Sequence, residues 1–168
     1  RIVVDPVMIA TSGSRLMDEE ATGVLIDAVL PLATVVTPNI EEAAVLAGFD
    51  IDGLEAMEEA ARAIARLGAR AVLVKGGHLT GEATDILFDG TGMKAFSSER
   101  VEGGRLHGTG CTLSAAIASG LARGSSLHDA VGDAKAFVTA AIRGAEIAGG
   151  ASALLDHIGA GRTMGGER

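Results

Sequence analysis

The chain has 168 residues, of which 48% are apolar and 21% are charged, a composition typical of a folded domain rather than a disordered segment. Its formal net charge of −8 argues against nucleic acid or an anionic membrane surface as a partner. The single cysteine, Cys111, excludes an internal disulfide and favours a reducing, cytoplasmic compartment, and no apolar run is long enough to span a bilayer.

Apolar runs alternate with amphipathic segments along the first hundred residues. Strands are predicted at 2–4, 34–37 and 71–74, with a hairpin formed by 85–88 and 93–96. Helices are predicted at 18–30, 41–47 and 54–67. The first of these helices is expected to place one set of apolar side chains on a common face: Val24, Leu25, Ala28 and Val29. Continuous apolar strands between helices indicate an α/β fold with a mostly parallel sheet.

The remainder of the chain is predicted to be mainly helical. Helices are expected at 111–121 and 127–147, and residues 159–168 are expected to form a flexible tail. The chain starts at Arg1 with a strand already under way and without a leading Met or turn. This start predicts that an N-terminal part of the natural protein is absent.

The segment His107–Thr112 is the strongest local signal for chemistry. Gly108 and Gly110 allow a tight turn and close approach to a ligand, directly before an apolar helix. The unpaired N–H groups of a helix's first turn, together with the helix dipole, favour an anion such as a phosphoryl group in transfer. A plain loop with a helix cap is the alternative for such a turn taken alone.

Cys111 lies in that first turn. A thiol at a helix N-terminus is a candidate base or nucleophile, whereas the alternative is a small residue buried in the packing of the helix.

Polar residues at two further places are candidate ligands. Asn39 and Glu42 stand three residues apart at a helix start, where an amide and a carboxylate can hold Mg²⁺-bound water near phosphates. The alternative is helix capping by Asn39 with a solvated Glu42. Lys75 and Asp5 follow strand ends, where α/β sheets bind ligands, and Lys75 is either a phosphate contact or an ordinary surface lysine.

The histidines give no metal-binding signal. His78, His128 and His157 have no shared ligand spacing and are interpreted as structural or solvent-facing.

Taken together, four segments resemble the hydroxymethylpyrimidine/phosphomethylpyrimidine kinases in order and approximate spacing. They are Asp5–Met8, Thr37–Glu42, Val74–His78 and His107–Ser114. The cysteine at position 111 is the most specific match, because most ribokinase-like sugar kinases carry Asp there.

The resemblance implies a three-layer α/β/α ribokinase-like fold, here lacking its N-terminal part, with residues 1–158 as the C-terminal, ATP-binding and catalytic part of this single domain. It also implies two successive transfers from ATP, with Mg²⁺, to hydroxymethylpyrimidine and then to its monophosphate in thiamin biosynthesis. The implied catalytic residues are Gly108, Thr109, Gly110, Cys111 and Lys75, with Cys111 as base or proton relay. The implied cofactor-binding residues are Asp5, Asn39, Glu42, Lys75, Ala134, Lys135 and Val138, of which Asn39 and Glu42 would hold Mg²⁺ through water.

The chain departs from the family pattern at two places. Nothing matches the family's glycine-rich, substrate-contacting N-terminal stretch, and Leu106 stands where the family commonly has Thr. Two alternatives therefore stay open, a pyridoxal-type kinase of the same superfamily and a truncated, non-catalytic nucleotide-binding remnant. Because related kinases are often dimers, a homodimer is also expected.

Overall fold

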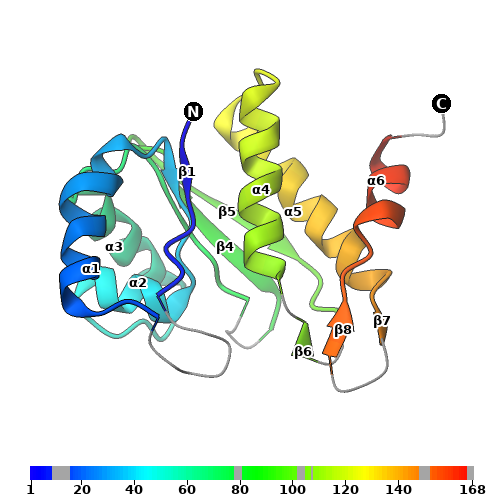
Figure 1. Cartoon of the computed structure of the whole chain (residues 1–168), viewed down its shortest axis with the longest axis horizontal. Helices are drawn as coiled ribbons and strands as arrows, with labels where there is room; N and C mark the ends of the chain where they lie inside the picture. The colour runs from blue at the N-terminus through cyan, green and yellow to red at the C-terminus, as the bar shows by residue number, and fades with distance from the viewer. Residues whose placement is uncertain (9–15, 78–80, 102–104, 107, 148–151, 166–168) are drawn as a thin grey trace. The chain divides into compact units, whose positions relative to one another are not determined.

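The computed structural model describes residues 1–8, 16–77, 81–101, 105–106, 108–147 and 152–165 (Figure 1). The chain divides into two compact units, Arg1–Ser97 and Ser98–Arg168. Among the helices of the described ranges, none combines the length and apolarity needed to cross a membrane.

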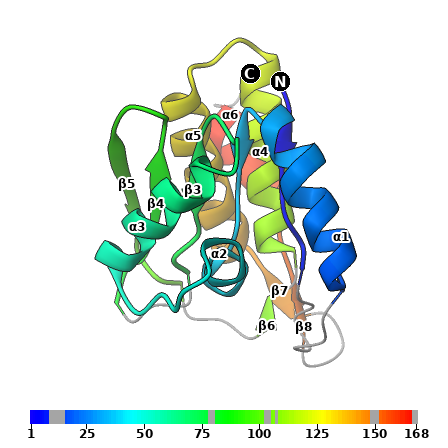
Figure 2. The same cartoon turned by 90° about the vertical axis from the view of Figure 1, so that its left-hand side faces the viewer.

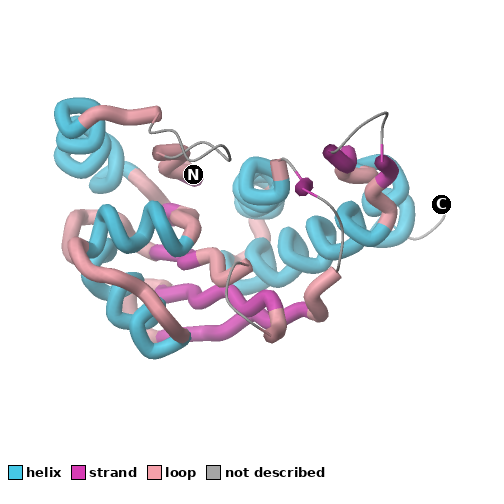
Figure 3. The backbone as a smooth tube through the Cα atoms, turned by 90° about the horizontal axis from the view of Figure 1, so that it is seen from below, coloured by secondary structure: helices cyan, strands magenta, loops and turns pink. Residues whose placement is uncertain are grey.

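The first unit is built on a five-stranded sheet, whose strands appear in magenta in Figure 3. In spatial order the strands are β1 (Val3–Val4), β2 (Val35–Val36), β3 (Val72–Val74), β4 (Ala83–Phe88) and β5 (Met93–Ser98). The pairings β1–β2 and β2–β3 are parallel, whereas β4 runs antiparallel to β3. The predicted α/β class is confirmed, and the predicted hairpin is present as β4 and β5.

Helices α2 (Ile40–Ala47) and α3 (Leu54–Ala65) belong to the same unit. The buried side chains of α3 recur at helical spacing: Met57, Ala60, Ala61 and Ile64, all fully buried. In Figure 2 this helix crosses in front of β3 and β4, whose apolar side chains complete the core. α3 ends two residues before the predicted Leu67. The C-cap of α2 is Gly48, whose φ of 82° is readily adopted by glycine.

The predicted helix at 18–30 is helical throughout, but it is not a regular α-helix in its second half. α1 covers only Glu19–Val24, with Asp18 as its N-cap, and is followed by a π-helical turn at Leu25–Val29 and a 3₁₀ turn at Leu30–Leu32. A π turn uses more residues per turn than an α-helix, so it changes which side chains point inward. Leu25 and Leu30 are buried and Val29 is partly buried, whereas Val24 and Ala28, also expected on the inner face, are exposed.

The second unit contains α4 (Thr109–Ala122), α5 (Leu127–Arg143) and α6 (His157–Gly165). α4 and α5 approach closely at Gly120, where a Cβ would lie 3.0 Å from the Cβ of Ala130. A small sheet joins β6 (Arg105–Leu106), β8 (Ser152–Leu154) and β7 (Glu146–Ile147), with β6 parallel and β7 antiparallel to β8.

Two predictions for this part of the chain are corrected. α5 ends at Arg143 rather than Ile147, because the chain turns at Gly144 and enters β7. α6 extends to Gly165, where the sequence indicated a tail from Gly159. This helix begins with a cap formed by the Asp156 carboxylate, which accepts the N–H of Gly159 at 2.8 Å.

Candidate functional site

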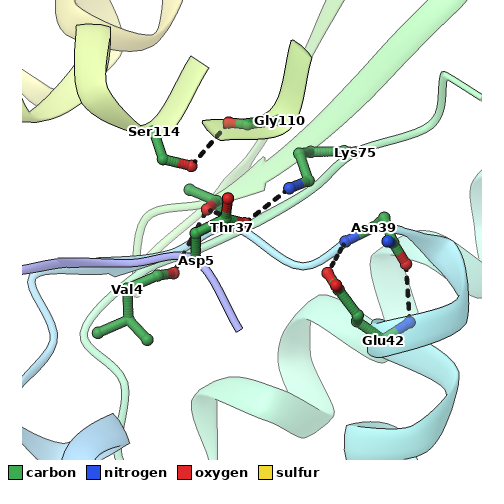
Figure 4. Close-up of polar contacts among 8 residues, drawn as sticks. All are labelled: Val4, Asp5, Thr37, Asn39, Glu42, Lys75, Gly110 and Ser114. Atoms are coloured by element: carbon green, nitrogen blue, oxygen red, sulfur yellow. Dashed lines mark hydrogen bonds and ion pairs between the residues drawn. The ribbon is translucent and has the colours of Figure 1, made fainter. Parts of the chain in front are cut away.

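Three polar side chains meet where neighbouring parallel strands of the first unit end. Asp5 follows β1, Thr37 follows β2 and Lys75 follows β3, so the strand order brings them to one edge of the sheet. Lys75 Nζ donates to Asp5 Oδ1 at 2.8 Å, and Thr37 Oγ1 lies 3.3 Å from the same oxygen (Figure 4). The side chains of Lys75 and Asp5 are only 14% and 16% exposed, so Lys75 is not an ordinary surface lysine.

Thr37 is a further member of this cluster, although its sequence position predicted only a strand end and the start of the Thr37–Glu42 segment. Its hydroxyl also lies 3.3 Å from the carbonyl oxygen of Val4, and the residue is fully buried. The signal that could have identified Thr37 is its place at a strand end, equivalent to the places of Asp5 and Lys75.

Asn39 and Glu42 form a reciprocal capping box at the start of α2. Glu42 N–H donates to Asn39 Oδ1, and Asn39 N–H donates to Glu42 Oε2, both at 2.8 Å (Figure 4). Capping by Asn39 is therefore confirmed. The accompanying expectation of a solvated Glu42 is wrong, because this residue is only 3% exposed.

Glu42 is electrostatically linked to the Asp5–Lys75 pair. Burial raises the pKa of the Glu42 carboxyl above its usual 4.5, and the negative charge of Asp5 acts in the same direction. The N–H groups of Asn39 and Met8 and the positive charge of Lys75 oppose this rise in pKa. The first turn of α2 and the segment after β1 are thus joined around one buried carboxyl group.

The chemistry of these residues fits a water-mediated Mg²⁺ ion. Among the described residues, no group of three or more His, Cys, Asp and Glu side chains could enclose a metal. Mg²⁺ commonly keeps several waters and is held by one or two carboxylates and by substrate phosphates, so it does not need such a group. Asp5 and Glu42 supply hard oxygen atoms of this kind beside Lys75.

Backbone contacts fix the position of Lys75. Its N–H donates to the carbonyl oxygen of Pro38 at 2.8 Å, which joins it to the segment leading into α2. The next residue, Gly76, donates its N–H to the buried Asp85 Oδ1 at 2.9 Å, and a Cβ at Gly76 would collide with the carbonyl oxygen of Thr84. The chain leaving β3 is therefore held against β4. His78, the last residue of the Val74–His78 segment, lies outside the described residues.

The glycine turn in the second unit opens α4. Gly108 has a φ of 88° and no side chain with which to cap the helix, and the N–H of Thr112 donates to its carbonyl oxygen at 2.8 Å. The N–H groups of Thr109, Gly110 and Cys111 precede this first helical bond and have no acceptor within the helix. The helix starts two residues before the predicted Cys111. Amides without an acceptor at a helix start are the groups with which helix N-termini bind anions.

Cys111 is exposed, which contradicts the alternative of a small residue buried in the helix packing. Nearby, Ser114 is buried and donates its hydroxyl to the carbonyl oxygen of Gly110 at 3.0 Å (Figure 4). This bond stabilises the first turn from within the helix. His107, at the start of the motif, lies outside the described residues.

The three residues expected near adenine lie on α5. Ala134 and Lys135 are 2% and 9% exposed, and Val138 is partly buried. Leu106, the departure from the family pattern, belongs to β6.

A comparison with protein families matches residues 1–154 to the family described as phosphomethylpyrimidine kinase. The chain belongs to this family. A curated hydroxymethylpyrimidine/phosphomethylpyrimidine kinase of Rhizobium meliloti (strain 1021) is 57% identical over 148 residues, covering 87% of this chain and 56% of the relative. The chain therefore spans little more than half the length of such relatives.

Solved structures of family members and of a related kinase share the fold. The phosphomethylpyrimidine kinase of Clostridium difficile 630 is 44% identical, with a TM-score of 0.71 over 83% of this chain and 56% of that chain. The pyridoxal kinase of Staphylococcus aureus, solved with AMP-PCP, is 37% identical, with a TM-score of 0.88 over 95% and 59% of the two chains. The resemblance to ribokinase-like kinases inferred from the sequence is confirmed.

Proposed function

We propose that the complete protein transfers phosphoryl groups from ATP to 4-amino-5-hydroxymethyl-2-methylpyrimidine and then to its monophosphate, in thiamin biosynthesis. Membership of the phosphomethylpyrimidine kinase family supports this activity, as does the 57% identity to the relative from Rhizobium meliloti. The observation that carries the proposal furthest is the uncapped first turn of α4 with an exposed Cys111 beside its amides.

In the first transfer, the hydroxymethyl oxygen forms a bond to the γ-phosphorus of ATP, and the bond from that phosphorus to the departing ADP oxygen breaks. The amides of Thr109, Gly110 and Cys111 stabilise the negative charge on the transferred group. Cys111 receives the proton of the attacking hydroxyl, directly or through water. The second transfer follows the same course, with a phosphate oxygen of the monophosphate as nucleophile.

In the first unit, Lys75 contacts a phosphate oxygen of ATP and exchanges part of its interaction with Asp5 for this contact. Asn39 and Glu42, with Asp5 nearby, would hold Mg²⁺ through water, and the ion would supply charge neutralisation on the phosphates. In the second unit, Ala134, Lys135 and Val138 on α5 border the adenine.

We also propose that the protein works in the cytoplasm as a homodimer. The single cysteine, which is unpaired and exposed, supports a reducing compartment. The dimer rests on the resemblance to the family, and light scattering of the purified protein tests it.

A substrate panel with the complete gene product tests the proposed reaction. A coupled ADP-release assay compares hydroxymethylpyrimidine, its monophosphate and pyridoxal side by side. The proposal predicts turnover of both pyrimidines with a higher kcat/KM than for pyridoxal. Preferential turnover of pyridoxal would favour the second candidate, a pyridoxal kinase, which the fold shared with the Staphylococcus aureus enzyme supports. Nucleotide binding without any turnover would indicate a non-catalytic remnant.

A further inference from the structure

His157 is the first residue of α6, and its side chain contacts the two other helices of the second unit. Its Nε2 and the Oγ1 of Thr112 on α4 are hydrogen-bonded at 2.9 Å. Its ring stacks on that of Phe137 on α5, with the centroids 6.3 Å apart and the planes inclined by 20°. A histidine that sequence spacing indicates to be merely structural or solvent-facing therefore links α4, α5 and α6.

The bond to Thr112 reaches the turn that carries the candidate anion site. Thr112 donates its backbone N–H to Gly108 and so closes the first hydrogen-bonded ring of α4. Gly108 provides no capping side chain, and a helix end that lacks a cap tends to fray. The contact with His157 therefore stabilises this turn from outside the helix, 45 positions later in the sequence.

The position of His157 is itself fixed by the backbone around it. The N–H of the preceding residue, Asp156, donates to the carbonyl oxygen of Ala141 on α5 at 3.0 Å. The Asp156 carboxylate caps α6 through Gly159, as described above. The imidazole thus projects from a helix start that is hydrogen-bonded to α5, so its position relative to Thr112 is fixed.

We infer that His157 is a positioning residue, which holds the first turn of α4 in the geometry that stabilises the transferred phosphoryl group. It acts through Thr112 and does not need to contact the substrate. The kinetic part of this inference rests on the proposed function, whereas the structural part concerns the order of the turn itself.

The test uses the complete protein and two pairs of variants. His157→Phe keeps a ring for stacking on Phe137 but removes the hydrogen bond, and Thr112→Val removes the hydroxyl with little change in shape. His157→Gln and Thr112→Ser are the matched controls, because each keeps a hydrogen-bonding group. The double variant His157→Phe with Thr112→Val completes a mutant cycle.

Two measurements are made on each variant: steady-state kcat and KM with the pyrimidine substrate, and amide hydrogen exchange along α4. We expect His157→Phe and Thr112→Val each to lower kcat by about three- to tenfold, the scale of one hydrogen bond, with KM changed by less than about twofold. The double variant should match the single ones, and the controls should stay within about twofold of the wild type. Exchange should accelerate at the Thr112 amide, whose bond to Gly108 closes the turn, more than in the rest of the helix.

Unchanged kcat in both hydrogen-bond-deleting variants, or additive losses in the double variant, would overturn the inference. A wild-type protein without kinase activity would instead refute the proposed function. Hydrogen exchange still decides the structural part in that case, since protection of the Thr112 amide that is equal in wild type and His157→Phe would refute it.

Discussion

Glu42 lies in the first turn of α2, and the residue is only 3% exposed. Its carboxyl group lies between the N–H groups of Asn39 and Met8 and near the charges of Lys75 and Asp5. Burial raises its pKa above 4.5, so the folded protein binds this proton more tightly than the unfolded chain does. The stability linked to this proton is fully present below about pH 4.5, and it is lost as pH rises through the raised pKa.

Replacing Glu42 with Gln is therefore expected to remove this pH dependence. Between pH 4 and 8, the free energy of unfolding of the wild type should fall relative to that of Glu42→Gln as pH rises. Urea unfolding at several pH values measures the difference, with Glu41→Gln, an exposed neighbour, as the control for loss of one charge. Parallel pH profiles of wild type and Glu42→Gln would contradict the account of this residue.

The Lys75–Asp5 pair gives a second prediction at the residue scale. Lys75→Met leaves the Asp5 carboxylate without its 2.8 Å partner in a position that is only 16% exposed. We expect a loss of about 1–3 kcal/mol of stability, and we expect Asp5→Asn in the same chain to restore part of it. Chemical unfolding of the two single variants and the double variant measures this coupling, and purely additive losses would disprove it.

The same lysine has a kinetic test. Because Lys75 is assigned to a phosphate oxygen of ATP, Lys75→Met is expected to lower kcat/KM for ATP by about tenfold or more. Steady-state kinetics at varied ATP concentration provide the measurement. Unchanged KM and kcat for ATP would remove Lys75 from the site.

At the scale of secondary-structure elements, the exit of β3 is held by its neighbour β4. A side chain at Gly76 would collide with the carbonyl oxygen of Thr84, whereas at the adjacent Gly77 a Cβ would meet no atom within 4 Å. Gly76→Ala should therefore lower stability by about 2–3 kcal/mol, and Gly77→Ala should change it by less than about 0.5 kcal/mol. Thermal or urea unfolding of the two variants compares them directly, and equal stabilities would contradict this view of the β3–β4 junction.

Elements with strong periodicity could be predicted, whereas those that depend on distant partners could not. α3 follows from apolar residues at helical spacing, and β3 follows from a continuous apolar run. The π-helical turn after Val24 has no such signal, because the apolar residues around it also fit a regular helix. β7 and β8 are short strands whose pairing joins separate segments, and no local pattern indicates it.

Considered over the whole molecule, the candidate site was predictable where one topological rule applied. Asp5 and Lys75 meet because parallel strands end at the same edge of a sheet, and this rule could be applied to the sequence. The burial of Glu42 and the contact of His157 with Thr112 depend on tertiary partners, which residue spacing does not encode. The fold was therefore more predictable than the environments of individual polar side chains.

We propose that the amides of the first turn of α4 bind the transferred phosphoryl group, beside the Cys111 thiol that takes part in transfer of the proton from the attacking hydroxyl. Turnover by Cys111→Ala in the complete protein, measured with hydroxymethylpyrimidine and ATP, tests this claim most directly. A fall in kcat of about 10²-fold or more, with an unchanged unfolding midpoint, is the predicted result. A kcat close to that of the wild type would contradict it.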